Sequence, residues 1–187
     1  MKYYKLLLDN SNDNDLFAYC DNLMDINHYD LMEGKALKNW REDIIFYYTP
    51  SEGDRYTDYL ANDLGWFIVS ERLKNILQQL DRNSQLFPVK IVNKLNKSQF
   101  KTYYVVNILN VVNALNLKES KYDLIEAEDI KIYSVSKYAL NRRELNNLNI
   151  IKLKGDELPL FVSELLKKTI TDNNITGCDF LEIKLIE

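Results

Sequence analysis

One short pattern constrains the fold of this chain more than any other: a turn, a brief apolar run, and a serine that precedes an amphipathic helix. It begins at Gly65–Trp66 and continues through Ile68–Val69 to Ser70. The Ser70 hydroxyl is placed to accept a hydrogen bond from a free backbone N–H of the first helical turn. The apolar residues that follow recur three and four positions apart, as on one helix face: Leu73, Ile76, Leu77 and Leu80. The pattern predicts a capped helix with one buried side.

The chain repeats this pattern near its C-terminus. Residues 69–71 (Val-Ser-Glu) and 162–164 (Val-Ser-Glu) match at a constant offset of 93 residues, and a strand-like segment follows each helix. We therefore interpret residues 65–93 and 159–187 as two similar helix–strand units. A true internal duplication and two chance matches of short patterns both explain this observation, and the sequence leaves both open.

The remaining segments predict mostly strands. A chain of 187 residues without a Pro- or Gly-rich linker favours a single domain spanning residues 1–187. Alternating or continuous apolar runs predict strands at Lys2–Leu8, Ile44–Tyr48, Phe87–Val92, Tyr103–Leu109, Ile130–Val135, Asn149–Leu153 and Phe180–Ile186. We predict an α+β fold with a mixed, largely antiparallel sheet and a few short packed helices.

Three segments have local patterns that differ from these simple strand runs. Leu16–Met24 is compatible with a helix capped by Asp15, but its aromatic residues favour a short strand. Tyr103–Leu109 is apolar on both faces except at Asn107, which predicts a central strand with a buried, hydrogen-bonded amide. Val111–Leu115 is predicted to form one short helical turn.

The sequence contains little that indicates catalysis. The five glycines are scattered, the two cysteines lack zinc-site spacing, and no serine nucleophile elbow is present. Asp9–Asp15 resembles the start of a calcium loop, but its sixth position is Asn14 and its twelfth is Cys20. We therefore expect no cofactor, no metal and no catalytic residue. A hydrolase using Asp54, Asp58 and Asp63 near Trp66 is the enzymatic alternative.

The expected cellular location and the charge of the chain restrict the classes of partner that it can bind. The first apolar run is too short for a signal peptide, and no stretch approaches the roughly 18 apolar residues of a membrane span. We expect a cytoplasmic protein, no membrane contact, and reduced Cys20 and Cys178. A net charge of −4 argues against nucleic-acid binding. The segment Leu6–Gly34 carries seven acids and no Lys or Arg, so the acidity is concentrated near the N-terminus.

The order of several motifs along the chain is similar to that of a known family. The segments that carry this similarity lie between Tyr29 and Ile186: Gly65–Trp66, Ile68–Ser70, Pro88–Val92, Tyr104–Asn107, Phe161–Ser163 and Ile175–Phe180. In this order they resemble a bacterial family of immunity proteins from polymorphic toxin systems. Each motif is a core pattern, and the first thirty residues match least.

The resemblance implies a non-enzymatic protein that binds a cognate toxin and blocks it by stoichiometric occlusion. It also implies that Trp66, Asn107 and Gly177 determine the fold. Because an acidic inhibitor is steered toward a basic toxin, we predict partner binding at five acids, with a merely solvated loop as the alternative: Asp13, Asp15, Asp21, Asp25 and Asp30. A structural or phage-associated interaction module is the alternative function.

Overall fold

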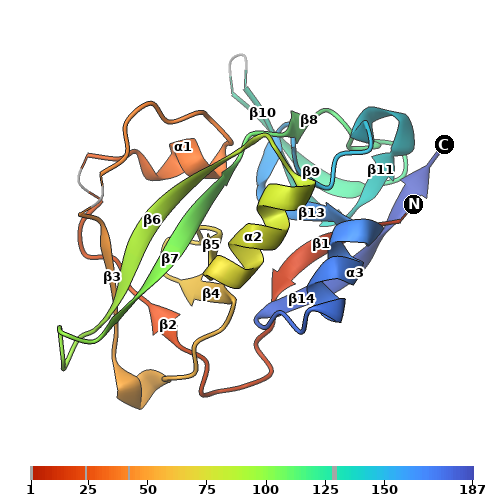
Figure 1. Cartoon of the computed structure of the whole chain (residues 1–187). Coiled ribbons are helices and arrows are strands. Elements are labelled where there is room, and N and C mark those ends of the chain that lie inside the picture. The colour runs from red at the N-terminus through yellow and green to blue at the C-terminus, as the bar shows by residue number, and fades with distance from the viewer. Residues whose placement is uncertain (1, 24, 42, 128–129) are drawn as a thin grey trace.

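A computed structural model describes residues 2–23, 25–41, 43–127 and 130–187 (Figure 1). Strands account for 44% of the structure and helices for 17%, which agrees with the predicted α+β class. The expected single mixed sheet is replaced, within these residues, by two six-stranded sheets and a two-stranded hairpin. No helix in this part of the chain is both long and apolar enough to cross a membrane.

The first sheet is built from the N-terminal half of the chain. Its strand order is β2 (Phe17–Ala18), β4 (Tyr59–Asn62), β5 (Ile68–Val69), β7 (Phe100–Ile108), β6 (Ser84–Asn93) and β3 (Ile45–Tyr48). The outer pairs β2–β4 and β3–β6 are parallel, whereas the inner pairs are antiparallel. An isolated bridge between Tyr19 and Tyr47 joins the two edges, so the sheet is nearly closed around its own core.

The second sheet combines the C-terminal half with the first strand of the chain. Its order is β8 (Val111–Val112), β12 (Ile150–Leu153), β13 (Asp156–Ser163), β1 (Tyr3–Leu8), β14 (Cys178–Ile186) and β11 (Ala139–Asn141). Here too the outer pairs are parallel and the inner pairs antiparallel. A bridge between Leu115 and Leu140 joins its edges around a separate core.

Two helices fill the space between the sheets. They are α2 (Glu71–Leu80) and α3 (Glu164–Asp172), and they contact each other. The predicted caps are confirmed, because the Ser70 and Ser163 hydroxyls accept from the backbone N–H groups of Leu73 and Leu166. The buried helix faces meet apolar residues of both sheets in a third core cluster. This shared core ties the two sheets into one body.

One further helix, a β-hairpin and two short 3-10 helices complete the described structure around the two sheets and the helices α2 and α3. The remaining elements are α1 (His28–Met32), the hairpin β9 (Lys121–Ala127) and β10 (Ile130–Lys137), and the short 3-10 helices η1 (Pro50–Glu52) and η2 (Arg142–Leu145). α1 lies between β2 and β3 in the chain, and the hairpin lies between β8 and β11. The backbone N–H of Tyr133 in the hairpin donates to the carbonyl of Gly155, which attaches the hairpin to the second sheet.

The predictions of local structure are confirmed where the residues of the segment itself determine its conformation or burial. The short strand preferred within Leu16–Met24 is confirmed at Phe17–Ala18, although Met24 lies outside the described residues. Asn107 is fully buried, and its amide donates to the Lys35 carbonyl and to Gln85. The helical turn predicted at Val111–Leu115 is wrong, because Val111 and Val112 pair in parallel with β12. A partner strand some forty residues later overrides the local preference.

Candidate partner-binding surface

The five acids predicted to bind a partner fall into two groups. Asp13, Asp21 and Asp25 are exposed, whereas Asp15 and Asp30 are partly buried and paired. The Asp15 carboxylate forms an ion pair with Arg55 at the start of β2, and the two backbones form a parallel bridge there. Asp30 lies 3.8 Å from the Lys35 ammonium and accepts from the Asn27 side chain. The structure therefore leaves three of the five acids free for a partner and gives two of them local roles.

Two neighbouring aromatic side chains, Phe17 and Tyr19, lie at β2, close to Asp15 in the chain. Along β2 the side chains alternate, so Leu16 and Ala18 are fully buried while Phe17 and Tyr19 are 36% and 42% exposed. The two exposed rings pack together with their centroids 4.9 Å apart. Large aromatic side chains on an exposed strand are typical anchors of protein interfaces. The sequence analysis missed this pair, because residues 16–19 are all apolar or aromatic and their order does not show which side chains face solvent.

Two acids, one before and one after β4, contact the residues on either side of the aromatic pair. At one end, Asp54 accepts a hydrogen bond from the side chain of Asn14, the neighbour of Asp13, at 2.8 Å. At the other end, Asp63 accepts from the backbone N–H of Cys20, the neighbour of Asp21, at 3.1 Å. Asp54 and Asp63 are both exposed. We call the set Asp13, Phe17, Tyr19, Asp21, Asp54 and Asp63 the β2 surface.

The corresponding edge of the second sheet has a different character. Phe17 lies beside Ala61, as Val111 lies beside Lys152, so Phe17 corresponds to Val111 and Tyr19 to Asn113. By the same register, Asp63 corresponds to the exposed Lys154. The two edges thus carry opposite charge at this position and have different side chains in place of the two aromatic rings. The aromatic and acidic character of the β2 surface is therefore not a requirement of the fold.

The carboxylate cleft of the hydrolase alternative does not assemble. Asp58 is buried, and its oxygens accept from the Ser70 hydroxyl, the Arg72 guanidinium, and the backbone N–H and hydroxyl of Thr176. A carboxylate with these partners is a structural link between the helix cap and the 173–177 turn. Asp54 and Asp63 instead accept hydrogen bonds from Asn14 and from the backbone of Cys20, and Trp66 is in the core.

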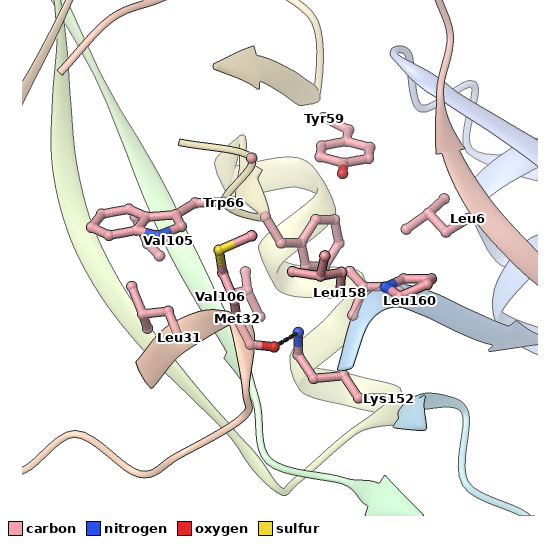
Figure 2. A pocket seen from close by; sticks show the side chains of 13 residues that line it. Leu6, Leu31, Met32, Tyr59, Trp66, Val105, Val106, Lys152, Leu158 and Leu160 are labelled. Atoms are coloured by element: carbon pink, nitrogen blue, oxygen red, sulfur yellow. Dashed lines mark hydrogen bonds between the residues drawn. The ribbon is translucent and has the colours of Figure 1, made fainter. Parts of the chain in front are cut away.

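A cavity of about 80 Å³ lies beside Trp66, between the two sheets. Figure 2 shows that apolar side chains line it, that the Tyr59 hydroxyl points into it, and that the Lys152 ammonium reaches across to the Met32 carbonyl. Lys152 also donates to the carbonyl of Glu157, and burial lowers the pKa of its ammonium to about 8. No carboxylate is present among the described residues that line this space. The cavity lacks the acid/base pair that a hydrolase would need.

The structure thus consists of two curled sheets joined by a shared core, and its β2 surface combines exposed aromatic rings with exposed acids. The chain belongs to the immunity protein family Imm11, which matches residues 2–185. This confirms the resemblance drawn from the core motifs, and it extends the match over the first thirty residues. No curated protein matches the chain. Proteins of immunity families are generally non-enzymatic.

Proposed function

We propose that this protein binds a cognate toxin of a polymorphic toxin system in the cytoplasm and neutralises it by stoichiometric occlusion. Membership of the Imm11 family carries this proposal, because immunity proteins act on toxins. The β2 surface supports it by offering aromatic anchors within an acidic surround. In this function the protein performs no reaction and binds no nucleic acid, membrane or cofactor.

The aromatic and the acidic side chains would contribute to toxin binding in different ways. Phe17 and Tyr19 would be desolvated on binding, and buried aromatic anchors contribute most of the affinity in many interfaces. The exposed acids Asp13, Asp21, Asp25, Asp54 and Asp63 would attract a basic toxin surface and raise the association rate. A cationic side chain of the toxin can also stack on an exposed ring. Asp15 and Asp30 would act indirectly, by holding β2 and α1 in place.

The test begins with capture of the toxin. The chain is expressed together with the product of the adjacent toxin gene, and copurification and rescue of bacterial growth are measured. The double variant Phe17→Ala/Tyr19→Ala is expected to weaken binding by about 10- to 100-fold, as is usual for the loss of interface anchors. The charge reversals Asp13→Lys, Asp21→Lys and Asp63→Lys are expected mainly to lower the association rate and its salt dependence.

Matched controls come from the second sheet and its surroundings. Leu117 is exposed to a similar degree as the two rings, and Asp123 and Glu144 are exposed acids. Leu117→Ala, Asp123→Lys and Glu144→Lys are expected to leave the affinity unchanged. If the wild-type chain captures the toxin and the β2 variants capture it equally well, the β2 surface is the wrong site. If the wild-type chain neither binds the toxin nor rescues growth, the proposed function is wrong.

A further inference from the structure

We infer that the chain is built from two copies of one six-stranded unit, and that the N-terminal strand β1 completes the second copy from the other end of the chain. This inference is independent of the proposed function, because it rests on the architecture alone. The first unit runs from β2 to β7. The second runs from β8 to β14 and then takes β1 as its last strand.

The two units have the same topology. In chain order, the first contains β2, β3, β4, β5, α2, β6 and β7, and the second contains β8, β11, β12, β13, α3, β14 and β1. In both sheets these strands occupy the same places, with the last strand of the unit between the two strands that flank the helix. Each parallel pair in one sheet corresponds to a parallel pair in the other. A 3-10 helix follows both β3 and β11.

The strand registers coincide as well. One row of paired residues crosses the first sheet through Tyr59, Val69, Tyr104 and Pro88. The equivalent row crosses the second sheet through Ile150, Val162, Tyr4 and Glu182. Because a slip of one residue in any strand would break this agreement, the match holds across four strands in each unit. It also aligns Tyr103–Tyr104 with Tyr3–Tyr4.

Side-chain contacts that the topology does not require are also repeated. The Tyr103 hydroxyl donates to the carbonyl of Thr57, just before β4, and the Tyr3 hydroxyl donates to that of Leu148, just before β12. The Lys74 ammonium lies 4.4 Å from the Tyr104 ring centre, and the Lys167 ammonium lies 4.0 Å from that of Tyr4. These repeated contacts favour common descent of the units over chance resemblance of two sheets.

The helix caps repeat in the same detail. The Ser70 hydroxyl donates to the Asp58 carboxylate at 2.5 Å, and the Ser163 hydroxyl donates to the Asn149 side chain at 2.6 Å. The backbone N–H of each serine donates to the backbone carbonyl of the same partner. Asp58 directly precedes β4, which pairs with β5 before Ser70, and Asn149 directly precedes β12, which pairs with β13, the strand that ends at Ser163. The cap, its partner and their order in the chain are therefore shared.

The position of β1 shows how the second copy differs. In the first unit β7 follows β6 through the connection 94–99 and forms a hairpin with it. In the second unit the equivalent neighbour of β14 is β1, and the two chain ends lie close together (Figure 1). Lys2 pairs with Glu182 at 2.9 Å at this junction. The second copy is thus circularly permuted, and without residues 3–8 it lacks the strand between β13 and β14. For this reason we also propose that residues 1–187 fold as a single domain.

Circular permutation of the whole chain tests the inference. In the first permutant a short Gly/Ser linker joins Glu187 to Met1, and the chain is opened between Asn10 and Ser11. Tyr3 then follows its partner Ile183 closely instead of preceding it by most of the chain. Since folding rates rise as contacts become local, we expect refolding on the order of tenfold faster than wild type. An unfolded permutant, or one that refolds no faster, would overturn the inference.

A second permutant serves as the matched control. It has the same linker but is opened between Lys97 and Ser98, so that β7 becomes the N-terminal strand of the first unit. If the units are equivalent, this chain repeats the wild-type arrangement one unit later and refolds at a similar rate. A second permutant that cannot fold, while the first one does, would show that the units are not equivalent.

A further measurement does not depend on permutants. A protease site placed at residues 10–12 of the full chain allows β1 to be cut from its covalent link. We expect the peptide to remain bound. We also expect that its removal in mild denaturant will expose the amides of β13 and β14 to hydrogen exchange before those of β5 and β6. Equal loss of protection in both sheets, or none in β13 and β14, contradicts the role assigned to β1.

Discussion

Replacing Ser163 with alanine tests how the helix caps hold the two sheets together. Ser163 is fully buried, and its hydroxyl makes two hydrogen bonds. It accepts from the Leu166 backbone N–H at 3.2 Å and donates to the Asn149 side chain at 2.6 Å. Ser163→Ala therefore removes a helix cap and leaves a half-buried amide oxygen without this donor.

The magnitude follows from these two losses. An N-cap substitution by alanine costs about 1 kcal/mol, and an unsatisfied buried acceptor costs about 1 kcal/mol more. Ser163→Ala should therefore lower the free energy of unfolding by about 2 kcal/mol, which corresponds to about 4–8 °C in Tm for a chain of this size. The measurement is urea denaturation followed by circular dichroism, supported by calorimetry.

Two other variants make this prediction falsifiable. Ser70 occupies the equivalent cap, but its partner Asp58 keeps donors from Arg72 and Thr176, so Ser70→Ala should cost only about 1 kcal/mol. Thr171 lies on the exposed side of α3, and Thr171→Ala should change stability by less than about 0.5 kcal/mol. A larger loss for Ser70→Ala than for Ser163→Ala would refute the reasoning about the unsatisfied acceptor.

Two further predictions concern a turn and a buried charge. Gly177 has φ +80°, and a Cβ there would lie 2.3 Å from the Tyr59 carbonyl oxygen, so Gly177→Ala should destabilise the fold by more than about 2 kcal/mol. Gly65→Ala, at φ +64° but with its Cβ in ordinary contact with the Met32 side chain at 3.9 Å, should cost less in the same denaturation assay. Burial lowers the pKa of Lys152 from its ordinary 10.5 to about 8, so above pH 8 the folded chain binds fewer protons than the unfolded chain. Stability should therefore gain about 1 kcal/mol from this group between pH 7 and 9, and Lys152→Met should remove that gain; an unchanged slope would contradict the assignment.

Whether a feature could be predicted from the sequence depends on the range of the interactions that determine it. The caps at Ser70 and Ser163 and the buried amide of Asn107 were predicted correctly, because side-chain type and local spacing decide them. The predicted helical turn at Val111–Leu115 failed because pairing with β12 decides that segment. The sequence showed only part of the proposed duplication, the two serine motifs. The matching Tyr3–Tyr4 and Tyr103–Tyr104 pairs lie at a different offset from the serine motifs, since β1 lies at the opposite end of the chain from the other strands of its sheet.

The β2 surface shows the same difference between features determined by local sequence and features determined by distant strand pairing. The sequence alone showed that acids are dense before Gly34, and it correctly predicted two capped helices and a resemblance to an immunity family. Hydrophobic periodicity and helix capping involve residues only a few positions apart, so the helices can be predicted without knowledge of the fold. Only the tertiary structure decided that Arg55 engages Asp15, that Phe17 and Tyr19 face solvent, and that Asp54 and Asp63 join them. Those relations depend on strand pairing across some forty residues, and no local pattern records which distant strand completes a sheet.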